Sequence, residues 1–305
     1  MKKILVTGGT GMVGRNVVQL LQKHNHEVLS PSRKELNLFE YHRVHDFIKN
    51  EKPDLVIHCA GLVGGIQANM NNLFGFLSEN LILGLNVVNA SRNNGIKNLL
   101  NLGSSCMYPK EAKNPLKEDS ILTGQLEHTN EGYALAKLSI AKLCQFATQQ
   151  ENLNYKTLIP CNLYGCWDKF DPQKSHMIPA AIRKVHLSLT NGEDIQIWGT
   201  GKTRREFMFA EDLADFILFA MDKMEKIPNM LNVGLGTDYT IQEYYESVRD
   251  VIGSKSNFCY DTTKPEGMKQ KVVDITLQTE LGWSPKTSLK EGISKTYQFY
   301  LENAK

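Results

Sequence analysis

The chain has 305 residues, 41% of them hydrophobic and 22% charged, a composition typical of a folded globular protein and not of a disordered chain. Its formal net charge of +2 is spread without long basic blocks, so neither nucleic acid nor an anionic membrane is an expected partner. No apolar run approaches the roughly 20 residues of a membrane-spanning helix, and Met1 to Thr7 leads directly into a strand, so we expect a cytoplasmic protein with small-molecule partners.

Short aliphatic runs alternate with amphipathic stretches of helix length through the first half of the chain. The expected strands are Ile4 to Val6, Glu27 to Leu29, Leu55 to His58, Asn98 to Leu102 and Tyr155 to Ile159. The expected helices between them include Val13 to Gln22 and Leu81 to Asn93. This alternation predicts βαβ units and therefore an α/β protein with a doubly wound parallel sheet.

Beyond Tyr164 the alternation weakens. The polar stretch from Asp168 to Ser175, which contains Pro172, predicts a surface loop that opens a second region. A helix and two segments that return to the main sheet are expected after it, at Ile178 to Leu187, Met208 to Met224 and Leu231 to Val233. We therefore predict a Rossmann-type domain and a smaller, discontinuous C-terminal domain, made of residues 1–166 with 206–233, and of residues 167–205 with 234–305.

A glycine-rich turn, TGGTGMVG from Thr7 to Gly14, follows the first strand and opens the first helix. Glycines allow a tight turn and a close approach to a pyrophosphate, whose charge then lies at the helix N-terminus. Such turns also occur without a ligand, but this position between strand and helix favours a dinucleotide site. The residues expected to contact the cofactor are Gly8, Thr10, Gly11, Met12, Val13 and Gly14.

The residues after the second expected strand indicate which dinucleotide binds. An NAD enzyme usually carries an acidic residue there, whereas this chain has Ser32, Arg33 and Lys34. A guanidinium and a hydroxyl suit a 2′-phosphate, so we expect NADP(H) held by Ser32 and Arg33. Alternatively, Arg33 is a solvated surface residue and Glu35 takes the acidic role.

Two further segments predict reductase chemistry. Ser104 lies just after a buried strand, at the sheet edge where ligands of such folds bind. Tyr133 and Lys137 are four residues apart, so on a helix they share a face, and the ammonium could lower the pKa of the phenol. Such a tyrosine can donate a proton to a ketone oxygen that Ser104 holds. A YxxxK pattern alone is common by chance, and the prediction depends on the combination.

The glycine turn, the serine after the strand and YxxxK, in this order, resemble the extended short-chain dehydrogenase/reductase family. Within it, a set of motifs resembles the GDP-L-fucose synthase family, whose members are GDP-4-keto-6-deoxymannose 3,5-epimerase/4-reductases. These motifs are spread along the chain, so the similarity covers nearly all of it. They are Leu102 to Pro109, Asn162 to Gly165, Ser175 to Pro179, Trp198 to Gly201, Arg205 to Phe207, Asn232 to Gly234 and Asp274 to Trp283. The resemblance implies a homodimer packed through the Tyr133 helix.

The resemblance also implies roles for individual residues. Ser104, Tyr133 and Lys137 would reduce the C4 ketone with NADPH, Tyr133 and Lys137 also contacting the cofactor, as would Asn162 and His176. Cys106 and His176 would invert C3 and C5, because a neighbouring ketone acidifies these C–H groups and a thiolate and an imidazole can act on opposite faces of the enolate. The residues implied to bind the GDP-sugar are Lys184, Trp198 and Arg205.

The six cysteines form neither a CxxC pair nor a metal-ligand pattern, so we expect free thiols, mostly small core residues, and no metal. Four positions depart from the family pattern. Thr10 replaces a frequent arginine of the glycine turn, Lys184 replaces an arginine of the pocket helix, and Cys161 and Cys166 replace threonine and proline. These changes leave Arg33 as the main 2′-phosphate ligand and allow a different sugar.

Two alternative functions remain open. One is a plain C4 reductase of a related GDP-4-keto-6-deoxy-heptose, in which Cys106 and His176 only line the pocket. The other is a non-catalytic NADP-binding module, which would not need Ser104, Tyr133 and Lys137 together. A dehydratase is disfavoured, because such enzymes usually carry acidic residues just after the post-strand serine or threonine, where this chain has Ser105 and Cys106.

Overall fold

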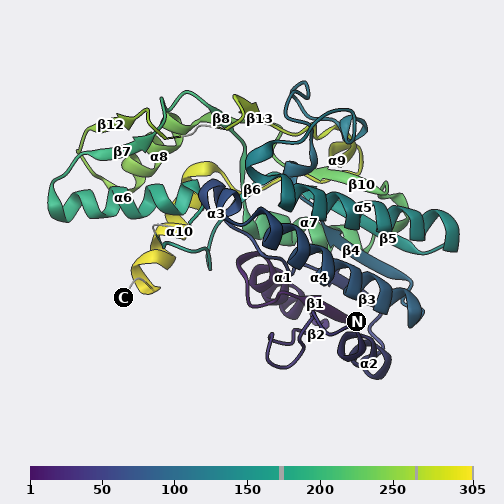
Figure 1. Cartoon of the computed structure of the whole chain (residues 1–305). Helices are drawn as coiled ribbons and strands as arrows, with labels where there is room; N and C mark the ends of the chain where they lie inside the picture. Colours follow the sequence, from purple (N-terminus) through teal and green to yellow (C-terminus); the bar gives the residue numbers. More distant parts are fainter. Residues whose placement is uncertain (172–174, 265–266, 304–305) are drawn as a thin grey trace.

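A twisted sheet of six parallel strands forms the centre of the larger domain (Figure 1). The computed structural model describes residues 1–171, 175–264 and 267–303. The strand order is β2-β1-β3-β4-β5-β10, and every neighbouring pair is parallel. The strands are β1 (Lys3–Thr7), β2 (Glu27–Leu29), β3 (Leu55–His58), β4 (Asn98–Leu102), β5 (Asn154–Pro160) and β10 (Met230–Val233). The order reverses beside β1, the position at which doubly wound sheets bind ligands.

Helices cover both faces of this sheet because its strands are apolar on both sides. Ile4 of β1 belongs to one buried cluster, together with residues of α1 (Met12–Lys23) and α7 (Ala210–Met221). The adjacent Leu5 belongs to a second cluster, on the opposite face, with residues of the other three long helices. These are α2 (Tyr41–Glu51), α4 (Leu73–Asn93) and α5 (Glu131–Glu151). The alternation follows the two-residue period of a strand.

Helix α4 corrects one expectation from the sequence. It begins at Leu73, eight residues before the predicted Leu81, because the Asn72 side chain accepts a hydrogen bond from the Gly75 N–H at 3.1 Å and caps the helix. With 21 residues and a mean hydropathy of 1.3 over its most apolar stretch, α4 is long and apolar enough to cross a membrane. It packs against α2 and α5 on the sheet, as a core helix does.

The smaller domain has its own apolar core, formed by α6 (Met177–Asn191), α8 (Ile241–Ile252) and α10 (Leu289–Asn303). Its strands form a parallel pair, β7 (Ile195–Trp198) with β12 (Phe258–Asp261), and a three-stranded sheet of β11 (Tyr239–Thr240), β8 (Arg204–Arg205) and β13 (Gln270–Lys271). A second parallel pair, β6 (Asn162–Tyr164) with β9 (Phe207–Phe209), lies where the chain passes between the domains. The short helices are α3 (Ile66–Asn71), α9 (Thr276–Glu280), η1 (Ser105–Met107), η2 (Glu118–Ser120), η3 (His128–Asn130) and η4 (Met224–Lys226).

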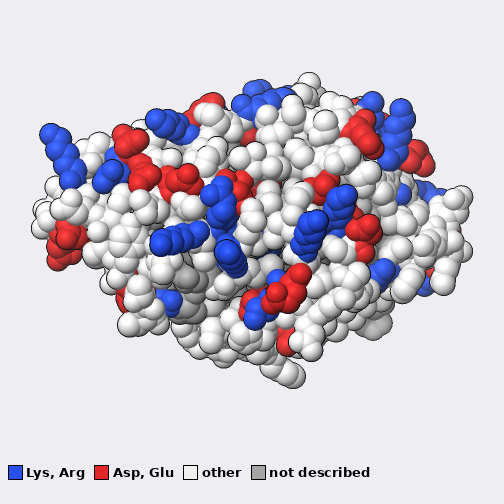
Figure 2. Space-filling view, turned by 90° about the horizontal axis from the view of Figure 1, so that it is seen from above, with Lys and Arg blue, Asp and Glu red and all other residues white. Residues whose placement is uncertain are grey.

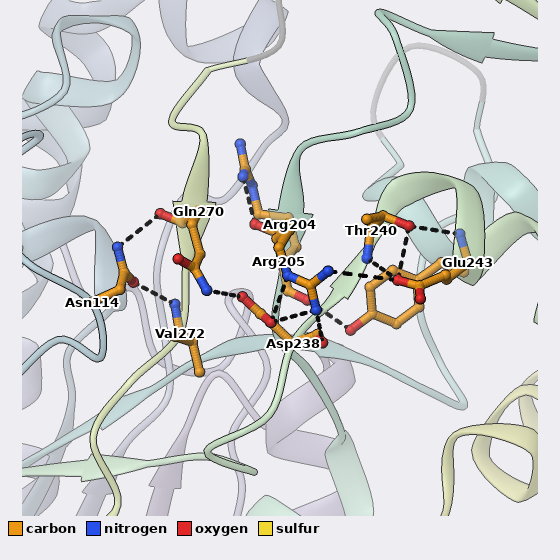
Figure 3. Close-up of polar contacts among 9 residues, drawn as sticks. Asn114, Arg204, Arg205, Asp238, Thr240, Glu243, Gln270 and Val272 are labelled. Atoms are coloured by element: carbon orange, nitrogen blue, oxygen red, sulfur yellow. Dashed lines mark hydrogen bonds and ion pairs between the residues drawn. The ribbon is translucent and has the colours of Figure 1, made fainter.

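Polar contacts tie the three-stranded sheet to the larger domain (Figure 3). Arg204 donates to the Asp238 carboxylate at 2.9 Å, and the Gln270 amide donates to its other oxygen at 2.7 Å. Asn114, from the loop after η1, donates to the Gln270 carbonyl at 3.3 Å and accepts from the Val272 N–H at 2.9 Å. These contacts fix the position of β8 relative to the larger domain.

The predicted fold class is confirmed, and every predicted strand and helix is present, with bounds shifted by a few residues except at the start of α4. The predicted division at residues 166, 205 and 233 stays a prediction. Val273 and Trp283 pack into the core of the larger domain, although they lie within the segment assigned to the smaller one. Residues 172–174 of the predicted Asp168 to Ser175 loop, Pro172 among them, lie outside the described residues.

Candidate active site

A cavity of about 570 Å³ opens at the carboxyl ends of the central strands, between the two domains. Most residues predicted for catalysis or cofactor binding line it. They are Gly8, Thr10, Gly11, Met12, Val13, Gly14, Arg33, Ser104, Cys106, Tyr133, Lys137, Asn162 and His176. Ser32, Lys184, Trp198 and Arg205 are not among its lining residues. The cavity therefore brings together the predicted cofactor and reaction residues, whereas the three predicted substrate residues lie elsewhere.

The glycine turn has the geometry that a dinucleotide diphosphate needs. Gly8 has a φ of +73°, and a Cβ built there would lie 2.6 Å from the backbone of Ala60. A Cβ on Gly14 would collide with the Gly8 carbonyl. Helix α1 begins after Gly11, which provides no side-chain cap, so the N–H groups of the first turn face the cavity end of the helix. The fit supports NADP(H) as the bound group.

The far end of the cavity matches an adenosine carrying a 2′-phosphate. Arg33 lines this end, with its guanidinium 5.2 Å above the ring of Phe39. The Glu35 carboxylate instead accepts from the Ser32 N–H at 2.7 Å and is absent from the cavity lining. Glu35 is thereby engaged in the turn, whereas Arg33 lines the cavity. Apolar residues complete this end, at Leu36, Leu38, Phe39 and Leu83.

The residues predicted to reduce the ketone lie together elsewhere in the cavity. Lys137 is buried, and its ammonium donates to the Leu102 carbonyl at 2.8 Å and lies 5.8 Å from the Tyr133 ring. Burial lowers the pKa of Lys137 to about 8. Burial raises the pKa of Tyr133, and a hydrogen bond with Ser104 opposes the rise. The expectation that Lys137 lowers the pKa of this phenol is wrong for the structure, because loss of hydration outweighs other effects.

Cys106 occupies the first turn after β4, where the Ser104 Oγ accepts from its backbone N–H at 3.2 Å. Its sulfur accepts hydrogen bonds from the Asn130 amide at 3.2 Å and the Lys271 ammonium at 3.5 Å. The Asn130 Oδ1 is buried and has no hydrogen-bond partner among the described residues. A thiolate at Cys106 would therefore be met by one positive charge and one amide donor.

His176 lies on the cavity wall directly before α6, at its N-cap position. Burial, and then the charge of Lys169, lower the pKa of its imidazole, so the neutral form dominates at neutral pH. Asp168 lines the same wall, and burial raises its pKa to about 7. One of its oxygens, Oδ2, is buried without a hydrogen-bond partner among the described residues. This wall therefore offers a carboxyl group that can exchange protons near neutral pH, together with a neutral imidazole.

The predicted substrate residues lie in the smaller domain. Trp198 of β7 is 49% exposed, and the ammonium groups of Lys184 and Lys264 lie 5.3 and 5.4 Å from its ring. Lys184 also donates to the Gln196 carbonyl at 2.8 Å. Arg205 lies on β8 and points away from Arg204, as successive side chains of a strand do (Figure 3).

Several residues of the site escape the sequence prediction. Asn130 stands at the N-cap of the Tyr133 helix, a position that could have marked it. Lys271 lies 165 residues from Cys106, and no local pattern connects the two. His58, at the end of β3, is buried against the Thr7 hydroxyl at 2.8 Å, and burial lowers its pKa to about 3. Among the described residues, no group of three His, Cys, Asp or Glu side chains could hold a metal ion.

Charges of both signs are interspersed on the face seen in Figure 2. That face carries no extended region of one sign, and the chain as a whole carries a formal net charge of only +2. This face therefore offers no broad field of one sign that would attract an anionic ligand.

Comparison with known proteins agrees with this geometry. Residues 4–234 match the NAD dependent epimerase/dehydratase family. The chain is 52% identical to the GDP-L-colitose synthase of Yersinia pseudotuberculosis, covering 98% of both chains, and 48% identical to the GDP-L-fucose synthase of Azorhizobium caulinodans, covering 98% of this chain and 96% of the relative. Its structure matches a GDP-mannoheptose C4 reductase of Campylobacter jejuni solved with NADP bound, at a TM-score of 0.89 and 34% identity over 98% of both chains.

Proposed function

The chain belongs to the NAD dependent epimerase/dehydratase family, and we propose that it reduces the C4 ketone of a GDP-4-keto-6-deoxy sugar after inverting C3 and C5. It is an NADP-dependent sugar-nucleotide oxidoreductase. The observation that carries the proposal is the convergence of two sets of groups on one cavity wall. Ser104 and Tyr133 form a ketone-reducing pair, and Cys106 lies beside them with two donors on its sulfur.

Reduction needs a hydride at C4 and a proton on the ketone oxygen. NADPH supplies the hydride when it is bound. Tyr133 supplies the proton, and its raised pKa keeps the phenol protonated until negative charge develops on the substrate oxygen. Ser104, which is hydrogen-bonded to Tyr133, holds that oxygen in place. Lys137 stays protonated below about pH 8 and keeps a positive charge beneath the reacting groups.

Inversion needs a base and an acid on opposite faces of the sugar. The Cys106 thiolate takes the proton from the carbon next to the ketone, and the electron pair of that C–H bond moves into an enolate. The protonated form of His176, a minor species at neutral pH, then gives a proton to the opposite face of the same carbon, so that a thiolate and an imidazolium become a thiol and a neutral imidazole. Negative charge on the enolate favours proton transfer from His176, although its pKa is low in the free protein.

The smaller domain holds the nucleotide part of the substrate in this proposal. Trp198 offers an exposed ring for a guanine to stack on, and Lys184 and Lys264 beside it offer charge to a diphosphate. Arg205 would contact the same diphosphate. With the nucleotide held there, the sugar reaches toward the cavity at Tyr133.

The second candidate is a C4 reductase of a GDP-4-keto-6-deoxy-heptose without epimerase activity. The observation that favours it is the structural match to a GDP-mannoheptose C4 reductase, because the same Ser104, Tyr133 and Lys137 would serve both reactions. A non-catalytic NADP-binding module would show no turnover of any GDP-4-keto sugar.

Hydrogen exchange separates these functions. Wild-type protein is incubated with GDP-4-keto-6-deoxymannose in deuterated water without NADPH, and deuterium at C3 and C5 is measured by mass spectrometry and NMR. We expect exchange in the wild type and its loss in Cys106→Ser, because a hydroxyl is a much weaker base than a thiol at neutral pH. Reduction at C4 should persist in that variant. Reduction by the wild type with neither exchange nor inversion would contradict the epimerase proposal and leave the plain reductase.

The proposal includes a cytoplasmic homodimer. The six cysteines of the chain are all free thiols, which agrees with a reducing compartment. Helices α4 and α5 pack side by side, and Phe146 of α5 is 50% exposed. A dimer through this face predicts that Phe146→Glu gives a monomer by light scattering, whereas the control Leu301→Glu on α10 leaves the mass unchanged. A wild-type monomer at micromolar concentration would contradict it.

A further inference from the structure

A stacked pair of side chains joins the glycine turn to the opposite wall of the cavity. The Arg15 guanidinium of α1 lies 4.5 Å above the ring of Trp167, and its Nε donates to the Thr10 carbonyl at 3.1 Å. Thr10 and Trp167 both line the cavity, although Arg15 does not. Arg15 therefore contacts one cavity-lining residue of the glycine turn and one of the segment around Trp167, without lining the cavity itself.

This arrangement places a positive charge where the glycine turn itself has none. The only side chains of the turn are those of Thr7, Thr10, Met12 and Val13, none of them charged. The Arg15 charge lies one hydrogen bond from the turn, on the same first helical turn whose N–H groups face the cavity. A diphosphate bound there would gain attraction from Arg15 without direct contact.

The backbone at Trp167 shows that its position is held by its surroundings. Its φ is +71°, in the left-handed region that large L-residues rarely adopt. Three contacts hold it there. Asn16 of α1 donates to the Cys166 carbonyl at 3.4 Å, the ring of Phe299 from α10 lies 4.8 Å away edge-on, and the Asp168 N–H donates to the Gly165 carbonyl at 3.3 Å. The turn 165–168 is thus anchored to α1 and to α10.

We propose that Arg15 and Trp167 form a clamp that holds the glycine turn against the turn 165–168 and so positions the cofactor diphosphate between them. Both are positioning residues, because Arg15 acts through the turn and Trp167 forms the facing wall. The clamp concerns cofactor binding alone. It therefore stands or fails independently of which sugar the enzyme reduces and of whether Cys106 exchanges protons.

The test is a double-mutant cycle on NADP+ affinity, measured by calorimetry without any sugar. Arg15→Met and Trp167→Leu should each raise the Kd roughly tenfold, the range of a partly desolvated cation–π contact. Because both variants break the same contact, the double variant should be no weaker than either single one. Trp167→Phe keeps an aromatic face under Arg15 and should retain affinity within about threefold.

Two further measurements separate positioning from general damage. In all variants that fold, kcat at saturating NADPH should stay within about threefold of wild type while KM for NADPH follows the Kd. Arg43→Met, an exposed arginine of α2, is the matched control and should change neither. An unchanged Kd in Arg15→Met, or effects that multiply in the double variant, would overturn the clamp. If Trp167→Leu does not fold, Arg15→Met and Trp167→Phe still decide it.

Discussion

The buried ammonium of Lys137 makes a prediction that separates stability from function. Its pKa falls from the ordinary 10.5 to about 8. A tenfold change in acidity is worth about 1.4 kcal/mol, so the charge costs the native state about 3 kcal/mol at pH 7. Lys137→Met removes this cost and keeps the stem. It also removes the hydrogen bond to the Leu102 carbonyl, a loss of about 1 kcal/mol. The free energy of unfolding should therefore rise by about 2 kcal/mol.

The sign of the pH dependence is fixed by the direction of this shift. Between pH 8 and 10.5 the unfolded lysine is protonated while the native one is not, so wild-type stability rises with pH over this interval. The advantage of Lys137→Met should accordingly be full below pH 8, shrink as the pH rises toward 10.5, and reach zero before pH 10.5 because the lost hydrogen bond is not recovered. Urea unfolding at pH 7 and pH 9, with reductase activity measured in parallel, provides the assay. A variant that is inactive and no more stable than the wild type at pH 7 would show that the buried charge of Lys137 does not destabilise the native state.

Three other predictions follow from single contacts of the site. Tyr133→Phe deletes only the phenol proton, so turnover should fall by roughly a hundredfold or more while NADP+ affinity, measured by calorimetry, is retained; near wild-type turnover would require another acid. Arg33→Ala should raise KM for NADPH by roughly ten- to a hundredfold and leave KM for NADH unchanged, because the variant loses a hydrogen bond to the charged 2′-phosphate. Equal effects on both cofactors would contradict the assignment of Arg33 to the 2′-phosphate. His58, with its pKa lowered to about 3, stays neutral in the native state while the unfolded chain protonates it below pH 6.5, so stability should fall as pH drops through this interval. His58→Gln should lessen that fall by roughly 2 kcal/mol at pH 5 in chemical unfolding, and an unaltered acid slope would contradict it.

The sequence predicts those parts of the site whose signal is local. The glycine turn, Ser104 after its strand and the four-residue spacing of Tyr133 and Lys137 all depend on the period of one element, and the structure brings them to one cavity. The partners of Cys106 depend on tertiary packing, since Lys271 arrives from β13 at the other end of the chain. The pKa values of the site also cannot be predicted from local sequence patterns. Spacing on a helix puts Lys137 near Tyr133, but burial decides both pKa values.

The arrangement of the predicted substrate residues in the smaller domain also depends on tertiary packing. The resemblance assigns Lys184 and Trp198 to the substrate, and the structure stacks them against each other on the smaller domain, outside the cavity lining. No periodicity in the sequence gives that distance, because it depends on how β7 packs beside α6. Glu35 has the sequence position of a ligand, but the structure gives it another partner. Its acidic side chain follows the second strand as an NAD ligand would, yet it bonds to its own turn at Ser32.

We propose that this cavity is where NADPH gives its hydride to C4 of a GDP-4-keto sugar. The most direct measurement uses NADPH deuterated at the transferred position, with GDP-4-keto-6-deoxymannose as substrate and NMR and mass spectrometry of the product. We predict one deuterium, bound at C4, in a GDP-6-deoxyhexose, together with loss of the nicotinamide absorbance in equal amount. Unchanged NADPH and sugar, with GDP-4-keto hexoses and heptoses alike, would contradict the claim.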